Sequence, residues 1–194
     1  LIGVSPLFAQ QGVTQCGTPT GQPKFPIETY QELPDPSSPS DKDWAAVTNP
    51  QISWGTIDTR YAKHRLPQLK KQQLTTLKGW RGERINAQAV VWTGTEVKDL
   101  NFSFTDFKDK KGNSLSDEAF KAGFIRYVMT DELNKDGRGA CGHRQAVDYD
   151  SLLVADPIDT NLKSMSVPAR TVQPIWVQCW IPQSATPGTY KGAL

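Results

Sequence analysis

The chain has 194 residues, of which 22 are lysine or arginine and 20 are aspartate or glutamate, so its formal net charge at pH 7 is +2. This length allows one domain with a substantial core. The near balance of charge excludes a polycationic nucleic-acid-binding protein, because such domains carry a concentrated basic footprint. A basic cluster does occur in residues 60–84, but acidic residues that follow it offset the charge. No transmembrane segment is predicted.

The first fifteen residues indicate export. Residues 1–10 are largely apolar, and the small residue Ala9 lies near a candidate cleavage point. We therefore expect a periplasmic, cell-surface or extracellular protein, with residues 1–15 as a signal-peptide remnant or an N-terminal arm. An ordered N-terminal strand is the alternative.

Residues 16–50 contain seven of the fourteen prolines. Proline removes a backbone donor and interrupts both helices and strand ladders, so this stretch is predicted to be an extended, exposed arm. Trp44 is a candidate anchor that would hold the arm on the following domain.

After residue 50, apolar and polar side chains alternate with a period of two, which predicts β-strands. We expect single strands at residues 51–61, 69–78 and 124–130. Residues 85–92 and 97–104 are separated by a short glycine-containing turn and are expected to form a hairpin.

In the second half of the chain, Ser116 is predicted to cap a single helical turn over residues 117–120 that Gly123 closes. Residues 145–171 show little periodicity and are expected to be a crossing connection. Residues 172–181 form the clearest strand pattern in the chain.

Residues 187–194 are expected to be a turn and the start of a strand that pairs with residues 172–181. A domain seldom ends at such a point, so we expect the sequence to be part of a longer protein. The short strands, the Gly/Pro/Asn turns and the absence of a long amphipathic pattern predict the all-β class. The specific prediction is a β-sandwich over residues 51–194 with long loops and at most one short helix; an open mixed sheet is the alternative.

Three cysteines allow three pairings, namely Cys16 with Cys141, Cys16 with Cys179, and Cys141 with Cys179. Cys179 alternates with apolar neighbours, so it is interpreted as a small buried hydrophobe. The disulfide state stays open.

Two pairs of adjacent carboxylates, Asp117 with Glu118 and Asp131 with Glu132, have the residue types that glycoside hydrolysis uses. Adjacent residues point in different directions on a strand or a helix, so adjacency does not define an active site. Asp117 and Glu118 lie in the predicted first turn of a helix, where carboxylates favour the helix dipole.

Two further motifs fall short of a metal site. The loop that begins at Glu132 lacks the terminal glutamate of a calcium-binding loop, since His143 occupies that position. Cys141 and His143 lie two residues apart, but they lack the further ligands of a closed zinc site. No catalytic residue, metal or cofactor is therefore assigned.

Aromatic and basic side chains supply the candidates for carbohydrate contact or a domain interface. Trp80, Arg81 and Arg84 lie in a glycine-containing corner that precedes a strand, and we expect them at a domain boundary. Trp176 and Trp180 lie four residues apart on one face of a predicted strand. That arrangement suits sugar stacking, a domain interface or the outer core of a sheet.

Several stretches of the chain resemble the N-terminal β-sandwich domain of glycoside hydrolase family 123. The members of this family are secreted bacterial enzymes that act on β-linked N-acetylgalactosamine. The resemblance rests on residues 79–84 with Gln88 and Trp92, on residues 126–131 and on residues 173–192. It implies retaining hydrolysis assisted by the substrate's acetamido group, with a neighbouring Asp and Glu in a C-terminal barrel. That barrel would begin after the last residue here, so no catalytic residue is transferred to this chain.

The resemblance thus implies a noncatalytic N-terminal domain of an exported, β-N-acetylgalactosaminidase-like glycoside hydrolase. Its expected partner is the C-terminal catalytic domain of the same chain, which it supports. The alternative is a carbohydrate-binding module whose surface tryptophans contact a glycan, and a purely structural surface domain is a third hypothesis. Sugar specificity and oligomeric state stay open.

Overall fold

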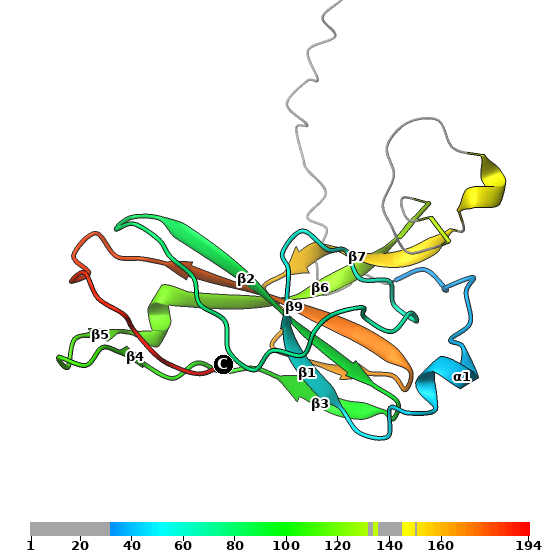
Figure 1. Ribbon diagram of the computed structural model, residues 1–194, viewed down its shortest axis with the longest axis horizontal. Coiled ribbons are helices and arrows are strands. Elements are labelled where there is room, and N and C mark those ends of the chain that lie inside the picture. The colour runs from blue at the N-terminus through cyan, green and yellow to red at the C-terminus, as the bar shows by residue number, and fades with distance from the viewer. Residues whose placement is uncertain (1–31, 132–133, 136–144, 150) are drawn as a thin grey trace, which may run out of the picture. The chain divides into compact units, whose positions relative to one another are not determined.

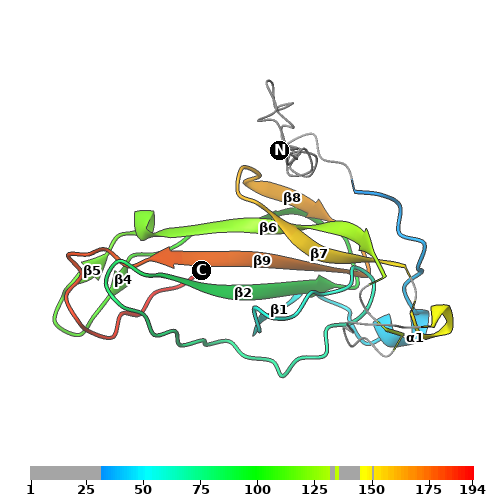
Figure 2. The same cartoon turned by 90° about the horizontal axis from the view of Figure 1, so that it is seen from above.

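The computed structural model describes residues 32–131, 134–135, 145–149 and 151–194. They belong to one compact unit that extends from Gln31 to Leu194. Its main element is a five-stranded antiparallel sheet (Figures 1 and 2). In spatial order its strands are β1 (Gln51–Gly55), β2 (Arg84–Thr93), β9 (Thr171–Trp180), β6 (Phe120–Thr130) and β7 (Leu152–Asp159).

Two smaller antiparallel sheets and three short helical turns complete the described fold. The sheets are β3 (Val97–Asn101) with β8 (Ser164–Val167), and β4 (Phe107–Lys108) with β5 (Ser114–Leu115). The helical turns are α1 (Asp41–Trp44) and the 3-10 turns η2 (Asp117–Ala119) and η3 (Ala146–Asp148). The predicted all-β class with long loops is confirmed.

One face of the five-stranded sheet packs against β3, β8 and the chain that follows β3. Alternate residues of β2 and β9 point to this face, and the ring of Phe102 lies 5.2 Å from that of Phe124. The sheet contributes Ala87, Ala89, Val91, Ala122, Phe124, Ile175 and Val177, and the covering layer contributes Leu100, Phe102, Phe104, Leu162 and Met165. The two layers therefore form a sandwich with an apolar interior.

The opposite face is covered by irregular chain rather than by a sheet. Here the intervening residues of β2 and β9, Val90, Trp92 and Val172, pack against α1 and the segment 56–83. Trp44, the only buried residue of α1, is 3% exposed and lies in this cluster. Trp44 therefore holds the described end of the proline-rich stretch on the sheet.

The segment 56–83 also contacts both edges of the five-stranded sheet. On the β1 edge, the Trp54 amide donates to the Gln72 carbonyl at 2.9 Å. On the β7 edge, the Lys63 amide donates to the Leu153 carbonyl at 2.9 Å. The outer backbone of each edge strand therefore finds partners in one connecting segment.

Several predicted strand pairings are wrong. Residues 85–92 and 97–104 do not form a hairpin, because β2 pairs with β1 and β9 while β3 pairs with β8. Alternation indicates which side of a strand is buried but does not identify its neighbour. The end of the chain behaves similarly, since Lys191 pairs with Lys108 of β4 and not with β9.

The expected connection over residues 145–171 contains β7 and β8 instead. The first four residues of β7 are all buried, because clusters cover the strand on both sides, and such a strand shows no alternation. Pro157 also obscured the strand. It lies where the register of β6 and β7 shifts, and a bulge in an edge strand tolerates the missing amide of proline.

Three smaller expectations also fail. Residues 69–78 contain no strand, and the first predicted strand ends at Gly55. Gly123 lies inside β6 and does not close a helix; a side chain there would collide with the Asp159 carbonyl at 2.7 Å. The glycine therefore permits close approach of β7.

Candidate functional site

The chain enters β2 through a tight turn made of Trp80, Arg81, Gly82 and Glu83. The Glu83 amide donates to the Trp80 carbonyl at 3.1 Å, and Gly82 has φ +82°, which favours glycine. The Glu83 carboxylate accepts from the Trp80 amide at 2.7 Å. The Gly82 amide donates to the carbonyl of Ile181 at 2.8 Å, so the turn is fixed to the end of β9.

Arg84 and Trp180 are paired across β2 and β9 at this corner. The guanidinium carbon of Arg84 lies 4.7 Å from the centre of the Trp180 ring, which is a cation–π contact. Trp180 is 55% exposed and Trp80 is 83% exposed. The structure therefore brings four of the five candidate residues, Trp80, Arg81, Arg84 and Trp180, to one end of the sheet.

Trp176 belongs to a different environment. It lies on the same strand face as Trp180, as predicted, but it is half-buried and packs against the buried cluster of Ile125, Tyr127, Leu153 and Ala155. Between the two tryptophans, Gln178 donates to the Asn86 side chain at 3.3 Å. Trp176 is therefore partly a core residue, whereas Trp180 lies on the surface.

The three described carboxylates of the predicted pairs, Asp117, Glu118 and Asp131, are exposed. Asp117 and Glu118 are exposed in η2, where Ser116 Oγ accepts from the Glu118 amide at 3.2 Å, as the capping prediction required. Asp131 is exposed at the end of β6. Its neighbour Glu132 lies outside the described residues.

The cysteine and metal motifs are only partly described. Cys179 is a free thiol that is 6% exposed, and burial raises its pKa above the ordinary value, in keeping with its interpretation as a small hydrophobe. Cys16, Cys141 and His143 lie outside the described residues. Within the part of the chain that the structure describes, no group of three His, Cys, Asp or Glu side chains could hold a metal ion.

A partly buried ionic cluster was not predicted from the sequence. Glu32 Oε2 accepts from Lys63 Nζ at 2.5 Å, and its Oε1 accepts from Arg126 Nε at 3.1 Å. Arg126 Nη1 also lies 3.4 Å from the carboxylate of Asp159, which is fully buried. These residues are widely separated in sequence, and no local motif marks them.

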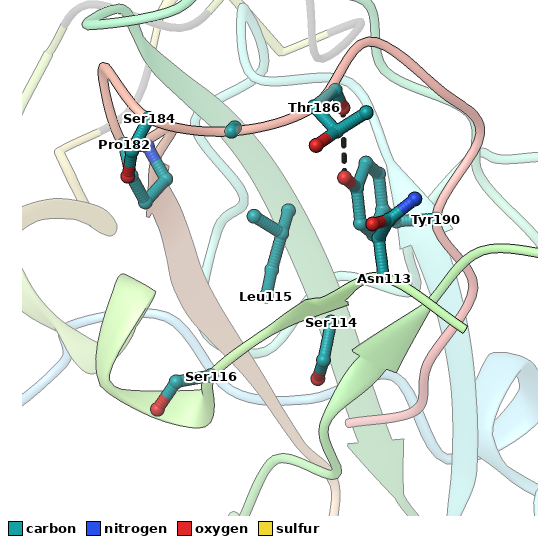
Figure 3. Close-up of a pocket in the computed structure, with 9 residues that line it drawn as sticks. Asn113, Ser114, Leu115, Ser116, Pro182, Ser184, Thr186 and Tyr190 are labelled. Atoms are coloured by element: carbon teal, nitrogen blue, oxygen red, sulfur yellow. Dashed lines mark hydrogen bonds between the residues drawn. The ribbon is translucent and has the colours of Figure 1, made fainter. Parts of the chain in front are cut away.

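Figure 3 shows a shallow hollow between β5 and the segment 182–190. Leu115 projects into it, and Tyr190 donates to the Thr186 carbonyl at 2.7 Å. Its lining consists of Asn113, Ser114, Leu115, Ser116, Pro182, Ser184, Ala185, Thr186 and Tyr190. None of the lining side chains is an acid or a base that could act in catalysis near neutral pH.

Across the described ranges, no helix is both long enough and apolar enough to cross a membrane.

The layered antiparallel sheets make this an all-β sandwich domain. Trp80, Arg81, Arg84 and Trp180 form a corner at one end of its main sheet. The model of the glycoside hydrolase 123 N-terminal domain matches residues 54–194. The chain therefore belongs to this family, and the resemblance inferred from the sequence is confirmed.

A solved structure supports the same fold. It is that of a family 123 glycoside hydrolase from Clostridium perfringens, studied for glycolipid glycan hydrolysis, and it shares 23% sequence identity with a TM-score of 0.58. The alignment covers 75% of this chain and 24% of that enzyme, so the chain spans about a quarter of its length. None of the curated proteins matches this chain.

Proposed function

We propose that this chain is the noncatalytic N-terminal domain of an exported glycoside hydrolase that resembles β-N-acetylgalactosaminidases. The family match over residues 54–194 carries the proposal. In this role the sandwich supports a catalytic domain of the same polypeptide. Export rests on the apolar residues 1–10, and recovery of the protein from the periplasmic or extracellular fraction would test it.

The exposed positions of Asp117, Glu118 and Asp131 support a noncatalytic role. A glycosidase needs one carboxylic acid that protonates the leaving group and a second carboxylate that acts as nucleophile or base, or that orients the substrate's own acetamido group. Asp117 and Glu118 are occupied with a helical turn, and Asp131 is exposed at a strand end.

The test is to express these 194 residues and assay chromogenic β-N-acetylhexosaminides. We expect no turnover above a buffer control. Turnover that is lost on Asp131→Asn or Glu132→Gln substitution would contradict the noncatalytic role.

We further propose that the corner formed by Trp80, Arg81, Arg84 and Trp180 contacts the catalytic domain. Large exposed aromatic side chains on a rigid turn, together with arginine, are typical of interface centres. In the longer protein, Trp180→Ala should lower the midpoint of thermal unfolding of the catalytic domain. The same substitution in the 194-residue chain should change the unfolding free energy by less than about 1 kcal/mol, since the side chain is largely exposed.

Carbohydrate binding by the same tryptophans is the alternative. Arg84 lies over the Trp180 ring, and Trp176 packs partly into the core, so each has less free aromatic surface on which a sugar could stack. Tryptophan fluorescence during titration with N-acetylgalactosamine oligomers separates the two roles. Saturable quenching that disappears in Trp80→Ala or Trp180→Ala would favour the binding module.

A further inference from the structure

Residues 32–47 lie against the sandwich, and we call them the strap. Polar contacts hold its first half: Glu32 forms ion pairs with Lys63 and Arg126, and the Asp35 carboxylate lies 3.8 Å from Nε2 of His64. Asp41 forms a more exposed ion pair with Arg170.

The second half of the strap is held differently. Trp44 is buried, and its Nε1 donates to the His64 carbonyl at 2.9 Å. Val47 packs against the same apolar cluster as Trp44. These contacts involve no ionised group, so they do not depend on protonation or on salt.

Glu32 lies near the point where β6 and β9 stop pairing within the five-stranded sheet. Residues Phe120 to Phe124 of β6 pair with β9, and after Phe124 the two strands are no longer paired. The Gln173 side chain donates to the Ile125 carbonyl at 2.9 Å, and the Glu32 carboxylate accepts from the Tyr127 amide at 3.3 Å. Side chains thus satisfy backbone groups that a neighbouring strand would otherwise pair.

The electrostatics of Glu32 favour its ionised form. Burial acts to raise the pKa of this carboxyl group, but hydrogen bonds and charge from Lys63, with further bonds from Arg126 and the Tyr127 amide, outweigh it and lower the pKa below 4.5. The other charged groups nearby are Asp35 in the strap and Asp159 on β7, which faces Arg126.

We propose that the strap is attached to the sandwich at two separate places. The Glu32 attachment, which we call the lock, can be released, whereas the Trp44 attachment stays in place. Neutralising Glu32 frees residues 32–40 from the sandwich while α1 and Val47 stay bound. The nine residues, once released, can extend to roughly 30 Å. This inference does not depend on the glycosidase function.

The sign of the pH dependence follows from the lowered pKa. The lock contributes its full stabilisation above the ordinary glutamate pKa, and the contribution is lost as the pH falls through the lower folded-state value. Acidification should therefore open the first half of the strap before the sheet unfolds.

The test is backbone ¹⁵N relaxation by NMR on the full chain, with hydrogen exchange of the β9 amides as the measure of the sheet. In Glu32→Gln, the heteronuclear NOE of the strap amides at Leu33, Asp35, Ser37, Ser38 and Ser40 should fall to the values of a flexible segment, because the charge-assisted contacts of Glu32 are lost. The amides of β9 should keep their protection from exchange. Asp41→Asn is the matched control, because it neutralises an exposed strap carboxylate and should leave the NOE values of these five amides unchanged.

Equal NOE values in Glu32→Gln and the unmodified chain would overturn the proposal, as would an equal effect of Asp41→Asn. Loss of β9 protection together with the strap would also overturn it, since Glu32 would then stabilise the whole fold. If Glu32→Gln does not fold, a pH series from 7 to 3 on the unmodified chain decides the question. In that series the NOE values of the strap amides must fall at a higher pH than the one at which β9 loses its protection, after correction of exchange for its intrinsic pH dependence.

Discussion

Single buried polar side chains carry much of the specificity of this sandwich. Gln173 is 1% exposed, and its Nε2 donates to the carbonyls of Ile125 and Pro174 at 2.9 Å each. Gln88 is similarly buried and donates to the carbonyls of Thr56 and Thr59. Gln88 thus bonds irregular backbone that follows β1, whereas Gln173 bonds strand carbonyls at the point where β6 and β9 stop pairing.

We expect Gln173→Leu to destabilise the chain by about 1–3 kcal/mol, because two buried carbonyls lose their donor. Urea unfolding followed by circular dichroism measures the change. Gln68→Leu is the control, since Gln68 is exposed and its replacement should stay within about 0.5 kcal/mol. Similar values for the two variants would show that the Gln173 bonds contribute nothing specific.

Gly94 and Gly112 are needed for different reasons, the first for lack of space and the second for its backbone conformation. A β-carbon at Gly94 would lie 1.7 Å from the Val47 carbonyl oxygen, whereas Gly112 has φ +87° with nothing within 4 Å. Gly112→Ala should cost only the conformational strain of about 1–2 kcal/mol.

Gly94→Ala should cost more, about 3 kcal/mol or above, because backbone must move and Val47 must leave its cluster. Thermal unfolding of the two variants side by side makes the comparison. A smaller loss for Gly94→Ala than for Gly112→Ala would contradict the close approach.

At the scale of elements, the divergence of β6 and β9 is the least regular part of the sheet. Tyr127 is fully buried there and donates from its hydroxyl to the Val172 carbonyl. Burial, with the negative charges of Glu32 and Asp35, raises the pKa of Tyr127 well above 10.0. The neutral phenol therefore contributes stability below the ordinary tyrosine pKa, and this is lost as the pH rises towards the folded-state value.

Tyr127→Phe should lower stability near pH 7 by about 1 kcal/mol, since Val172 loses a donor. Above pH 10 the unmodified chain should lose stability more steeply than Tyr127→Phe. Tyr61, whose pKa burial also raises, retains part of the alkaline slope in the variant. Parallel alkaline curves for both chains, measured by urea unfolding at a series of pH values, would refute the role of the buried phenol.

The elements also show what the sequence can predict. The alternation of Ile175, Val177 and Cys179 predicted β9 correctly, and the turn before β2 was predicted as a corner from its glycines. The strand β7 was missed because it is buried on both sides and contains Pro157. Strand neighbours could not be assigned, because pairing depends on contacts between distant segments.

The same limit applies to the candidate site. The sequence identified Trp80, Arg81, Arg84 and Trp180 as candidates, and the structure brings them to one corner. The sequence gave no indication of the Glu32 cluster, because Lys63 and Arg126 lie 31 and 94 residues away from Glu32. Ion pairs between such distant residues leave no local pattern in a sequence.

At the scale of the whole molecule, the tryptophans fall into structural and surface classes. Trp44→Ala should destabilise the chain by about 3–5 kcal/mol, because it empties a buried site. Trp80→Ala should change stability by less than about 0.5 kcal/mol. Differential scanning calorimetry of both variants tests the division, and a large effect of Trp80→Ala would show that the corner supports the fold itself.

The irregular segment 56–83 has a consequence for solubility. An uncovered edge strand is a template for pairing with a second chain and is a common origin of aggregation. By bonding to Trp54 on one edge and to Leu153 on the other, the segment occupies positions that an incoming strand would need. Because these backbone positions are already bonded, neither edge strand presents a free ladder there to a second chain.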